Sequence, residues 1–234
     1  KDGQEFYVVS GQALPAYEKV KLFHMPIDRS AHAFAGYRKG QWYACQNGLE
    51  LFSADDIITI NISPTGGRVA FQMKKGADVF IQEQGQIGPM FEKISDLHFS
   101  EAAQFLAYVG LRDGQEYFVL NHELQFSVPQ GSHFIDYVFS LQGKRWVCFY
   151  GEESYPESLA TVVADGEMLS RRAEYDIDHW WSHDYFSPDE SSLAFPIKTK
   201  SGESALWHDG KEYVAASSST ARLCGWLPDN VPGW

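Results

Sequence analysis

Short runs of alternating apolar and polar residues recur along the whole chain, and alternation with a period of two is typical of β-strands. Ile60 and Ile62, for example, stand two residues apart directly before the turn sequence SPTGG at 63–67. Proline presets φ in such a turn, and the glycines tolerate the tight geometry that follows. No segment of helical period extends beyond two turns. The pattern therefore predicts an all-β protein.

The strand pattern repeats along the chain with a fixed period of 37 residues. Residues 23–48 overlay residues 97–122 without a gap. The period is marked by the residue that follows a short strand, at Gly11, Gly48, Gly85 and His122. A repeat of about 40 residues made of short strands is the signature of a β-propeller.

Each repeat contains four strand-like runs, as expected of a four-stranded propeller blade. The second run carries a small residue followed by an aromatic one, as in Ala70-Phe71 and Ala107-Tyr108. The small side chain lets neighbouring blades approach, and the aromatic ring fills the wedge between them. The third run ends in a dipeptide that favours a type I′ hairpin. Such dipeptides are Asn47-Gly48, Asp165-Gly166 and Asp209-Gly210.

Six turn positions predict a six-bladed propeller formed by a single domain, residues 1–234. The turns fall at Pro26, Ser63, Ser100, Ser140, Ser187 and Leu227. Five repeats are complete, and we expect the sixth blade to be split between residues 1–16 and 218–234. The ring would then be closed by strands from both termini, which leaves no free sheet edge. The sequence ends where the second strand of this blade should begin, so we expect that strand to be missing.

The combination of an SPDG-like turn, a Leu-Ala-Phe/Tyr strand and a DG hairpin resembles the TolB-type, or WD40-like (PD40), propeller repeats. The best match is FSPDESSLAF at 186–195, followed by ISPTGGRVAF at 62–71. Residues 101–103 and 141–143 depart from the turn motif. The resemblance extends over essentially the whole chain, but its motifs build turns and packing and carry no chemistry. It implies a binding platform, although some members of this superfamily are enzymes or gating domains of serine peptidases.

Composition narrows the choice of partners. The net charge of −12 argues against nucleic acid, which requires clustered Lys and Arg. No run of 18 apolar residues occurs, so no membrane span is expected. The three cysteines lie far apart at strand positions, and we interpret them as buried free thiols without a disulfide framework or zinc site.

Catalytic motifs are missing, but polar residues gather on the predicted first strands of the blades. The chain contains no GxSxG, no HExxH and no phosphate-binding glycine loop. First strands lie nearest the propeller axis, where five imidazole and carboxylate groups would converge and suit a transition metal or acid–base chemistry. The alternative is that these groups bond neighbouring strands and channel water. We predict no metal and no cofactor, and name as metal candidates only His24, His98, His183, Asp96 and Asp136.

Segments of variable length indicate a functional face. From the hairpin position to the next turn serine there are 15 residues after Gly48, but 21 after Gly166. The added residues fall around 128–134, 150–159 and 171–185, which we expect to lie consecutively on one face. Loops on a rigid scaffold usually carry the binding residues. The predicted binding residues are His133, Tyr150, Glu152, Glu153, Tyr155, His179, Trp180, Trp181 and His183.

Three hypotheses for the function remain open. The preferred one is a monomeric, non-enzymatic binding propeller that recognises a protein or peptide through this face. The second is an enzyme at the channel mouth, either glycan-acting or a metal-dependent hydrolase or lyase. The third is a structural module excised from a larger protein, suggested by the start in mid-repeat. The compartment does not follow from the residues, and the resemblance alone points to an extracytoplasmic one.

Overall fold

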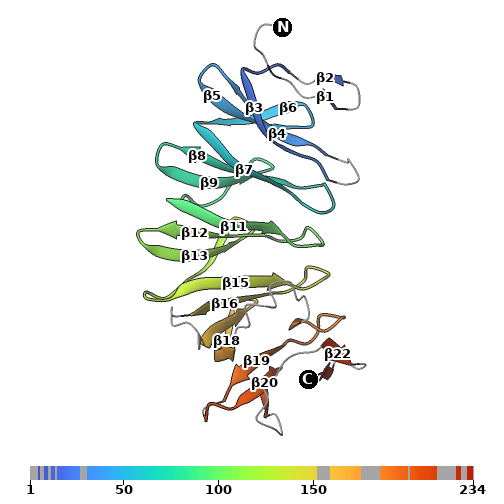
Figure 1. The fold of residues 1–234 in the computed structure, drawn as a ribbon, viewed down its shortest axis with the longest axis vertical. Coiled ribbons are helices and arrows are strands. Elements are labelled where there is room, and N and C mark those ends of the chain that lie inside the picture. Colours follow the sequence, from blue (N-terminus) through green and yellow to red (C-terminus); the bar gives the residue numbers. More distant parts are fainter. Residues whose placement is uncertain are drawn as a thin grey trace. The chain divides into compact units, whose positions relative to one another are not determined.

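The computed structural model describes residues 5, 8–9, 12–13, 15–26, 31–151, 159–174, 185–199, 201–214, 225–227 and 231–233. The chain divides into two compact units, unit 1 (1–125) and unit 2 (126–234), shown in Figure 1. Apart from a 3-10 conformation at Tyr185, every regular element in the described ranges is a β-strand, which confirms the all-β prediction. Within those ranges, no helix is long and apolar enough to cross a membrane.

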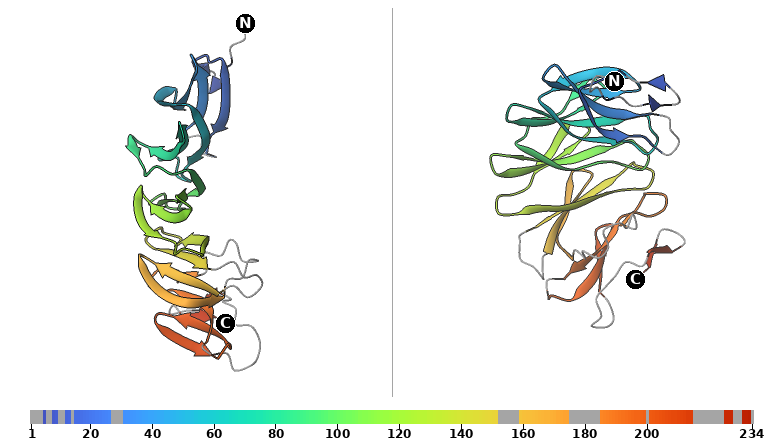
Figure 2. Two further views of the ribbon diagram at one scale, coloured as in Figure 1. Left: turned by 90° about the vertical axis from the view of Figure 1, so that its left-hand side faces the viewer. Right: turned by 45° about the horizontal axis from the view of Figure 1, so that its top comes forward.

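Unit 1 contains three four-stranded antiparallel sheets, each with its strands paired in chain order (Figure 1; two further views in Figure 2). The first sheet comprises β3 (Lys19–His24), β4 (Ala33–Arg38), β5 (Gln41–Gln46) and β6 (Leu49–Ala54). The second comprises β7 (Asp56–Ile62), β8 (Val69–Lys75), β9 (Asp78–Glu83) and β10 (Gln86–Ile87). The third comprises β11 (Lys93–Phe99), β12 (Leu106–Arg112), β13 (Gln115–Leu120) and β14 (Glu123–Ser127), whose last residues already belong to unit 2. These sheets have the up-and-down order of propeller blades.

Unit 2 contains one seven-stranded sheet where the repeat predicted two separate blades. Its strands are β15 (His133–Phe139), β16 (Trp146–Gly151), β17 (Leu159–Ala164), β18 (Glu167–Glu174), β19 (Ala194–Lys198), β20 (Ser204–His208) and β21 (Lys211–Val214). A single pair, Ala173 with Ile197, joins β18 to β19. The two predicted blades are therefore continuous because β18 extends far enough to pair with the edge of β19.

Two further sheets have two strands each. One pairs β1 (Val8–Val9) with β2 (Gln12–Ala13), and the other pairs β22 (Gly225–Leu227) with β23 (Val231–Gly233). The expectation that no second strand follows β22 is wrong, because β23 returns antiparallel to it after a short connection. The strands near the two termini are paired in separate sheets. The six-bladed ring and its closure by the termini therefore stay predictions.

The hairpins between third and fourth strands have the predicted type I′ geometry. Both central residues have positive φ, 50° and 80° at Asn47-Gly48 and 49° and 87° at Asp165-Gly166. The side chain of the first residue has a second role, since its Oδ1 accepts a hydrogen bond from the backbone N–H at the start of the second strand. The Asn47 bond comes from His32 at 3.0 Å. The same bond is made by Asn121, Asp165 and Asp209.

The turn serines are structural. Ser63 and Ser187 are almost completely buried, and the Oγ of each accepts a hydrogen bond from the backbone N–H five residues later. In both turns the serine carbonyl also accepts a bond from the residue three positions on. Ser100 and Ser140 make the same contacts. Turns that lack the Pro-Asp-Gly motif, at 101–103 and 141–143, thus keep the same geometry.

The core lies between the faces of neighbouring sheets. The small-aromatic pairs are fully buried, with Ala70 and Phe71 each at most 1% exposed. Because successive residues of a strand face opposite sides, Phe71 packs toward the first sheet of unit 1 and Ala70 toward the third. The predicted wedge packing is confirmed. Cys45 and Cys148 are buried free thiols, as predicted, while Cys224 lies outside the described residues.

The connections between sheets bury one large side chain against a glycine. The Tyr17 ring lies over Gly36, and the Phe91 ring lies over Gly110 in the third sheet, 74 residues later. At the same position of the second sheet both sizes are reversed: Ala54 and Met73 stand there, and both belong to one buried cluster. Tyr17, Ala54 and Phe91 are followed in the chain by an acidic residue, Glu18, Asp55 and Glu92. The side chain of each acidic residue accepts a hydrogen bond from a backbone N–H of the hairpin that joins strands two and three.

Candidate functional site

The predicted loop face involves strand ends in unit 2. The register pairs His133 with Gly151, and Leu159 with Glu174, so these four ends lie at one end of the sheet formed by β15–β18. They flank the variable segments 128–132, 152–158 and 175–184. His133 is exposed there. The other predicted binding residues, apart from Tyr150, lie outside the described residues: Glu152, Glu153, Tyr155, His179, Trp180, Trp181 and His183.

Tyr150 differs from the expectation of a surface residue. Its side chain is 8% exposed, and its ring centroid lies 5.9 Å from that of Phe126. Tyr150 sits on β16, which is buried along its whole length. The ring therefore packs within unit 2, and the binding role of Tyr150 stays a prediction.

The axial candidates of unit 1 lie on the first strands of their sheets. His24 ends β3 and is exposed, and it lines a cavity of about 490 Å³ together with Met25, Asn61 and Pro64. His24 and Asn61 both stand two residues before a turn position. The convergence of His24, His98, His183, Asp96 and Asp136 on a central channel stays a prediction. The Asn61 amide also donates a hydrogen bond of 2.7 Å to the carbonyl of Leu97 on the next first strand.

A backbone irregularity precedes each of the two histidines on these strands. Leu22 and Asp96 have φ of 59° and 54°, in the left-handed region that is costly for residues other than glycine. The pairing register shifts immediately before His24 and before His98. Asp96 and His98 are exposed, but they do not line the cavity. Asp136 is half-buried on β15 in unit 2.

These histidines and carboxylates do not form a metal site in the part of the chain that the structure describes. No group of three or more His, Cys, Asp or Glu side chains there is arranged to hold a metal ion. His183 lies outside the described residues. The metal candidates named from the sequence stay predictions.

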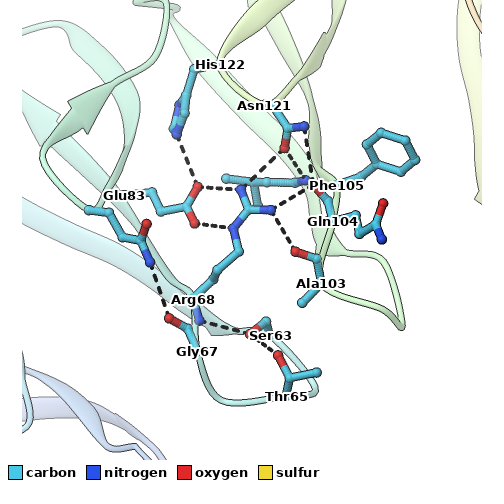
Figure 3. Close-up of polar contacts among 12 residues, drawn as sticks. Ser63, Thr65, Gly67, Arg68, Glu83, Ala103, Gln104, Phe105, Asn121 and His122 are labelled. Carbon is cyan, nitrogen blue, oxygen red and sulfur yellow. Dashed lines mark hydrogen bonds and ion pairs between the residues drawn. The ribbon is translucent and has the colours of Figure 1, made fainter. Parts of the chain in front are cut away.

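The most extensive polar cluster of unit 1 was not predicted from the sequence (Figure 3). Arg68, between β7 and β8, forms a two-point ion pair with Glu83 of β9, with Nε–Oε1 and Nη2–Oε2 distances of 2.6 and 2.8 Å. Glu83 is almost completely buried, with 4% of its side chain exposed. A parallel pair of this kind is the strongest geometry available to a carboxylate and a guanidinium.

The guanidinium also reaches the third sheet. Arg68 Nη1 donates to the carbonyls of Ala103 and Gln104 at 2.8 and 2.9 Å, and Nη2 donates to Asn121 Oδ1 at 3.3 Å. The guanidinium carbon lies 5.1 Å from the centre of the Phe99 ring. Arg68 therefore connects the second and third sheets of unit 1, and Figure 3 shows these bonds converging on it.

Glu83 has a second partner in His122, whose Nε2 lies 3.3 Å from Glu83 Oε2. Burial by itself raises the pKa of a carboxyl group, but the hydrogen bonds from His122 and Arg68 outweigh it, and the pKa of Glu83 lies below its usual value. The carboxylate is thus held ionised. His122 occupies the second hairpin position, where other repeats have glycine, with φ of 67°.

Unit 2 contains an equivalent of Arg68. Arg145 also stands five residues after a turn serine, bonds Asp165 at 2.8 Å, and lies over the Phe186 ring at 5.4 Å. Its Nη1 donates to the carbonyls of Glu190 and Ser191. The fixed spacing from the turn serine was the available sequence signal. The recurrence indicates a structural role for both arginines.

Comparisons with known proteins find similarity of fold only. Neither protein-family models nor curated proteins match the sequence. Among solved structures, the chain is similar to the β-propeller domain of the Trilobed protease from Pyrococcus furiosus, described as having an open velcro topology (12% identity, TM-score 0.42, 79% of this chain and 66% of that chain covered). It is also similar to TolB from Acinetobacter baumannii, with 12% identity and a TM-score of 0.38 over 86% of this chain and 55% of that chain. A third similar structure is that of a eukaryotic initiation factor, with 13% identity and a TM-score of 0.48 over 88% of this chain and 57% of that chain.

The chain spans between about half and two-thirds of the length of these structures. The similarity concerns the fold, and no activity is transferred from it.

Proposed function

We propose that this chain is a non-enzymatic binding propeller that recognises a protein or peptide through the face around residues 128–134, 150–159 and 171–185. The observation that carries the proposal is the register of unit 2. The strand ends His133, Gly151, Leu159 and Glu174 lie at one end of one sheet, and they flank all three variable segments. Loops that leave a rigid sheet at the same end suit a shared recognition surface.

The composition of these segments indicates the kind of partner. They contain Trp180 and Trp181, and the carboxylates Glu152 and Glu153. Aromatic side chains are the usual anchors of protein interfaces, and carboxylates accelerate encounter with a basic partner. A basic peptide or protein is therefore the proposed partner class.

The experiment measures binding of the full chain to an array of Lys- and Arg-containing peptides, followed by calorimetry on the best binder. Trp180→Ala or Trp181→Ala should weaken binding by about 1–4 kcal/mol, the range of an aromatic anchor. The controls His98→Ala and Asp136→Ala should leave binding intact. Unchanged binding in both Trp variants would contradict the proposal. Turnover of a glycan or ester substrate that depends on an axial carboxylate would favour the enzyme hypothesis instead.

The proposed scaffold is a monomeric six-bladed ring in which residues 1–16 and 218–234 share the split blade. Short strands near both termini, β1–β2 and β22–β23, are compatible with it. Deletion of residues 1–16 should then unfold the whole chain at lower temperature in one transition. Retention of the full thermal transition would count against ring closure, without bearing on the binding face.

A further inference from the structure

The cavity of unit 1 lies between the ends of two neighbouring first strands. Its walls come from residues 24–26, at the end of β3, and from residues 61–64, at the end of β7. The apolar part of the lining is formed by Met25, Pro26, Ile62 and Pro64. The volume of about 490 Å³ falls within the range of about 300–1,000 Å³ that is usual for small-molecule sites. The size and the apolar lining are those of a ligand pocket.

At the next boundary between sheets, the corresponding positions hold an arginine stacked on an aromatic ring. Arg68 stands five residues after one turn serine, and Phe99 stands directly before the next. The guanidinium carbon lies 5.1 Å from the centre of the Phe99 ring. Unit 2 repeats the arrangement, with Arg145 at 5.4 Å from the centre of the Phe186 ring. A planar cation on a ring therefore recurs where one turn meets the next.

Both members of this stacked pair are replaced by smaller residues at the boundary that contains the cavity. Ala31 stands five residues after the turn position Pro26, at the place of Arg68, and it is 2% exposed. Ile62 stands directly before Ser63, at the place of Phe99, and it lines the cavity. The first and second sheets therefore lack the guanidinium and the ring that stack between the second and third.

The charge that accompanies the arginine is missing as well. Gln46 pairs with Ala33 in the first sheet as Glu83 pairs with Ala70 in the second, so a neutral amide stands at the place of the carboxylate. No Lys, Arg, Asp or Glu of the described residues lines the cavity. A charged ligand would lose hydration there without gaining an ion pair, which is costly. The cavity therefore suits a neutral ligand.

We propose that this cavity binds a neutral aromatic ring that carries a hydrogen-bond donor, such as an indole or a phenol. The ring fills the place of the stacked pair and packs against Met25, whose thioether makes favourable contacts with aromatic rings. The Asn61 amide donates to the Leu97 carbonyl, which orients it and leaves Oδ1 as an acceptor for the N–H or O–H of the ligand.

The site uses residues of unit 1 alone and does not rest on the binding face proposed for unit 2. The ring belongs either to a free molecule or to a Trp or Tyr side chain of a peptide. Both sources offer the same chemistry to the cavity, and a comparison of ligands separates them.

The first test follows the methionine methyl groups by NMR in the full chain with ¹³C-labelled methionine. Indole should shift the Met25 methyl signal through its ring current. Met90 is the internal control, because it is exposed to a similar extent, 51% against 41%, but does not line the cavity. 1-Methylindole, which cannot donate, and ethylguanidinium, which is charged, should each bind at least several-fold more weakly. Equal shifts at Met25 and Met90, or tighter binding of ethylguanidinium, would overturn the proposal.

A Trp-containing pentapeptide distinguishes the two sources of the ring. Tighter binding of the pentapeptide than of indole assigns the site to a peptide side chain. Binding of indole without binding of the pentapeptide assigns it to a free small molecule. Absence of a Met25 shift with both ligands would refute the site.

The second test fills or alters the cavity by mutation. Ile62→Phe restores the ring of the next boundary and should weaken indole binding at least tenfold. Ile58→Phe is the matched control, because Ile58 is exposed on the same strand and does not line the cavity. Asn61→Ala adds no volume and should abolish the preference for indole over 1-methylindole. Unchanged binding in Ile62→Phe, or an unchanged preference in Asn61→Ala, would contradict the assignment.

Discussion

Gly110→Ala tests the packing of an aromatic ring on a glycine between neighbouring sheets. The new Cβ would lie 2.5 Å from three atoms of the Phe91 ring. Carbon atoms pack at about 3.5–4.0 Å, so the ring must move by roughly 1 Å. Phe91 is 2% exposed and contacts Tyr108 and Tyr117, which leaves little room for that movement.

The expected cost follows from overpacking. Inserting a methyl group into a well-packed core costs about 1–3 kcal/mol. Replacing glycine by alanine also returns about 0.4–1 kcal/mol, because it restricts the unfolded chain and Gly110 does not have positive φ. The net destabilisation should be about 1–2 kcal/mol, or a fall of about 2–8 °C in Tm for a chain of this size.

The residues Ala54 and Met73 suggest a variant that should compensate for the loss of the Phe91 ring. Phe91→Ala alone should cost about 3–5 kcal/mol through the cavity it leaves. The double variant Phe91→Ala/Gly110→Met reproduces the Ala54–Met73 pair and should recover part of that loss. A favourable coupling of about 0.5–3 kcal/mol is expected for residues in contact.

Urea and thermal unfolding, followed by circular dichroism, measure these differences. Gly67→Ala is the matched control, because its Cβ would meet only Thr65 Oγ1 at 3.9 Å. It should stabilise the chain by about 0.4–1 kcal/mol, because it restricts the unfolded chain without a new clash. If Gly110→Ala is as stable as Gly67→Ala, or the double variant recovers nothing, the packing argument is wrong.

Three further predictions concern the buried charges and thiols. Arg68→Met should destabilise the chain by about 3–5 kcal/mol in urea unfolding, because it leaves the buried Glu83 carboxylate without its ion-pair partner. The control Lys21→Met breaks the more exposed ion pair with Asp56 and should cost less than about 1 kcal/mol. The pKa of Glu83 is lower in the folded state than its usual 4.5. The contribution of the Glu83 carboxylate to the free energy of unfolding should therefore be complete above pH 4.5 and be lost as the pH falls through the lower folded pKa. Glu83→Gln should flatten this acid dependence of stability, and an unchanged pH profile in the variant would refute the prediction. Burial raises the pKa of Cys45 to about 11, so mass spectrometry should find Cys45 unmodified by thiol reagents at pH 8 until urea unfolds the chain.

The sequence indicated the strands and segments that carry the candidate residues, but not the contacts that those residues make. His24 and Asn61 line one cavity, and only the structure shows that they do. Segment lengths indicated the three variable regions of unit 2. The burial of Tyr150 against Phe126 was not predictable, because alternation tells which side of a strand a residue faces but not what covers that side.

The sequence by itself determined the strands, the turns and the repeat. These depend on local rules: positive φ at Asn47-Gly48, a serine that bonds the residue five positions on, and small-aromatic pairs at a fixed place. Such rules act within a few residues, so they can be read directly from the chain.

Only the tertiary structure decided which residues meet across sheets. The Phe91 ring against Gly110, Arg68 against the carbonyls of the next turn, and the continuous seven-stranded sheet all join segments whose pairing no local rule specifies. The physical reason is that close packing selects for the combined volume and hydrogen bonding of both partners. One residue of such a pair therefore does not reveal the contact until the structure shows which residue lies beside it.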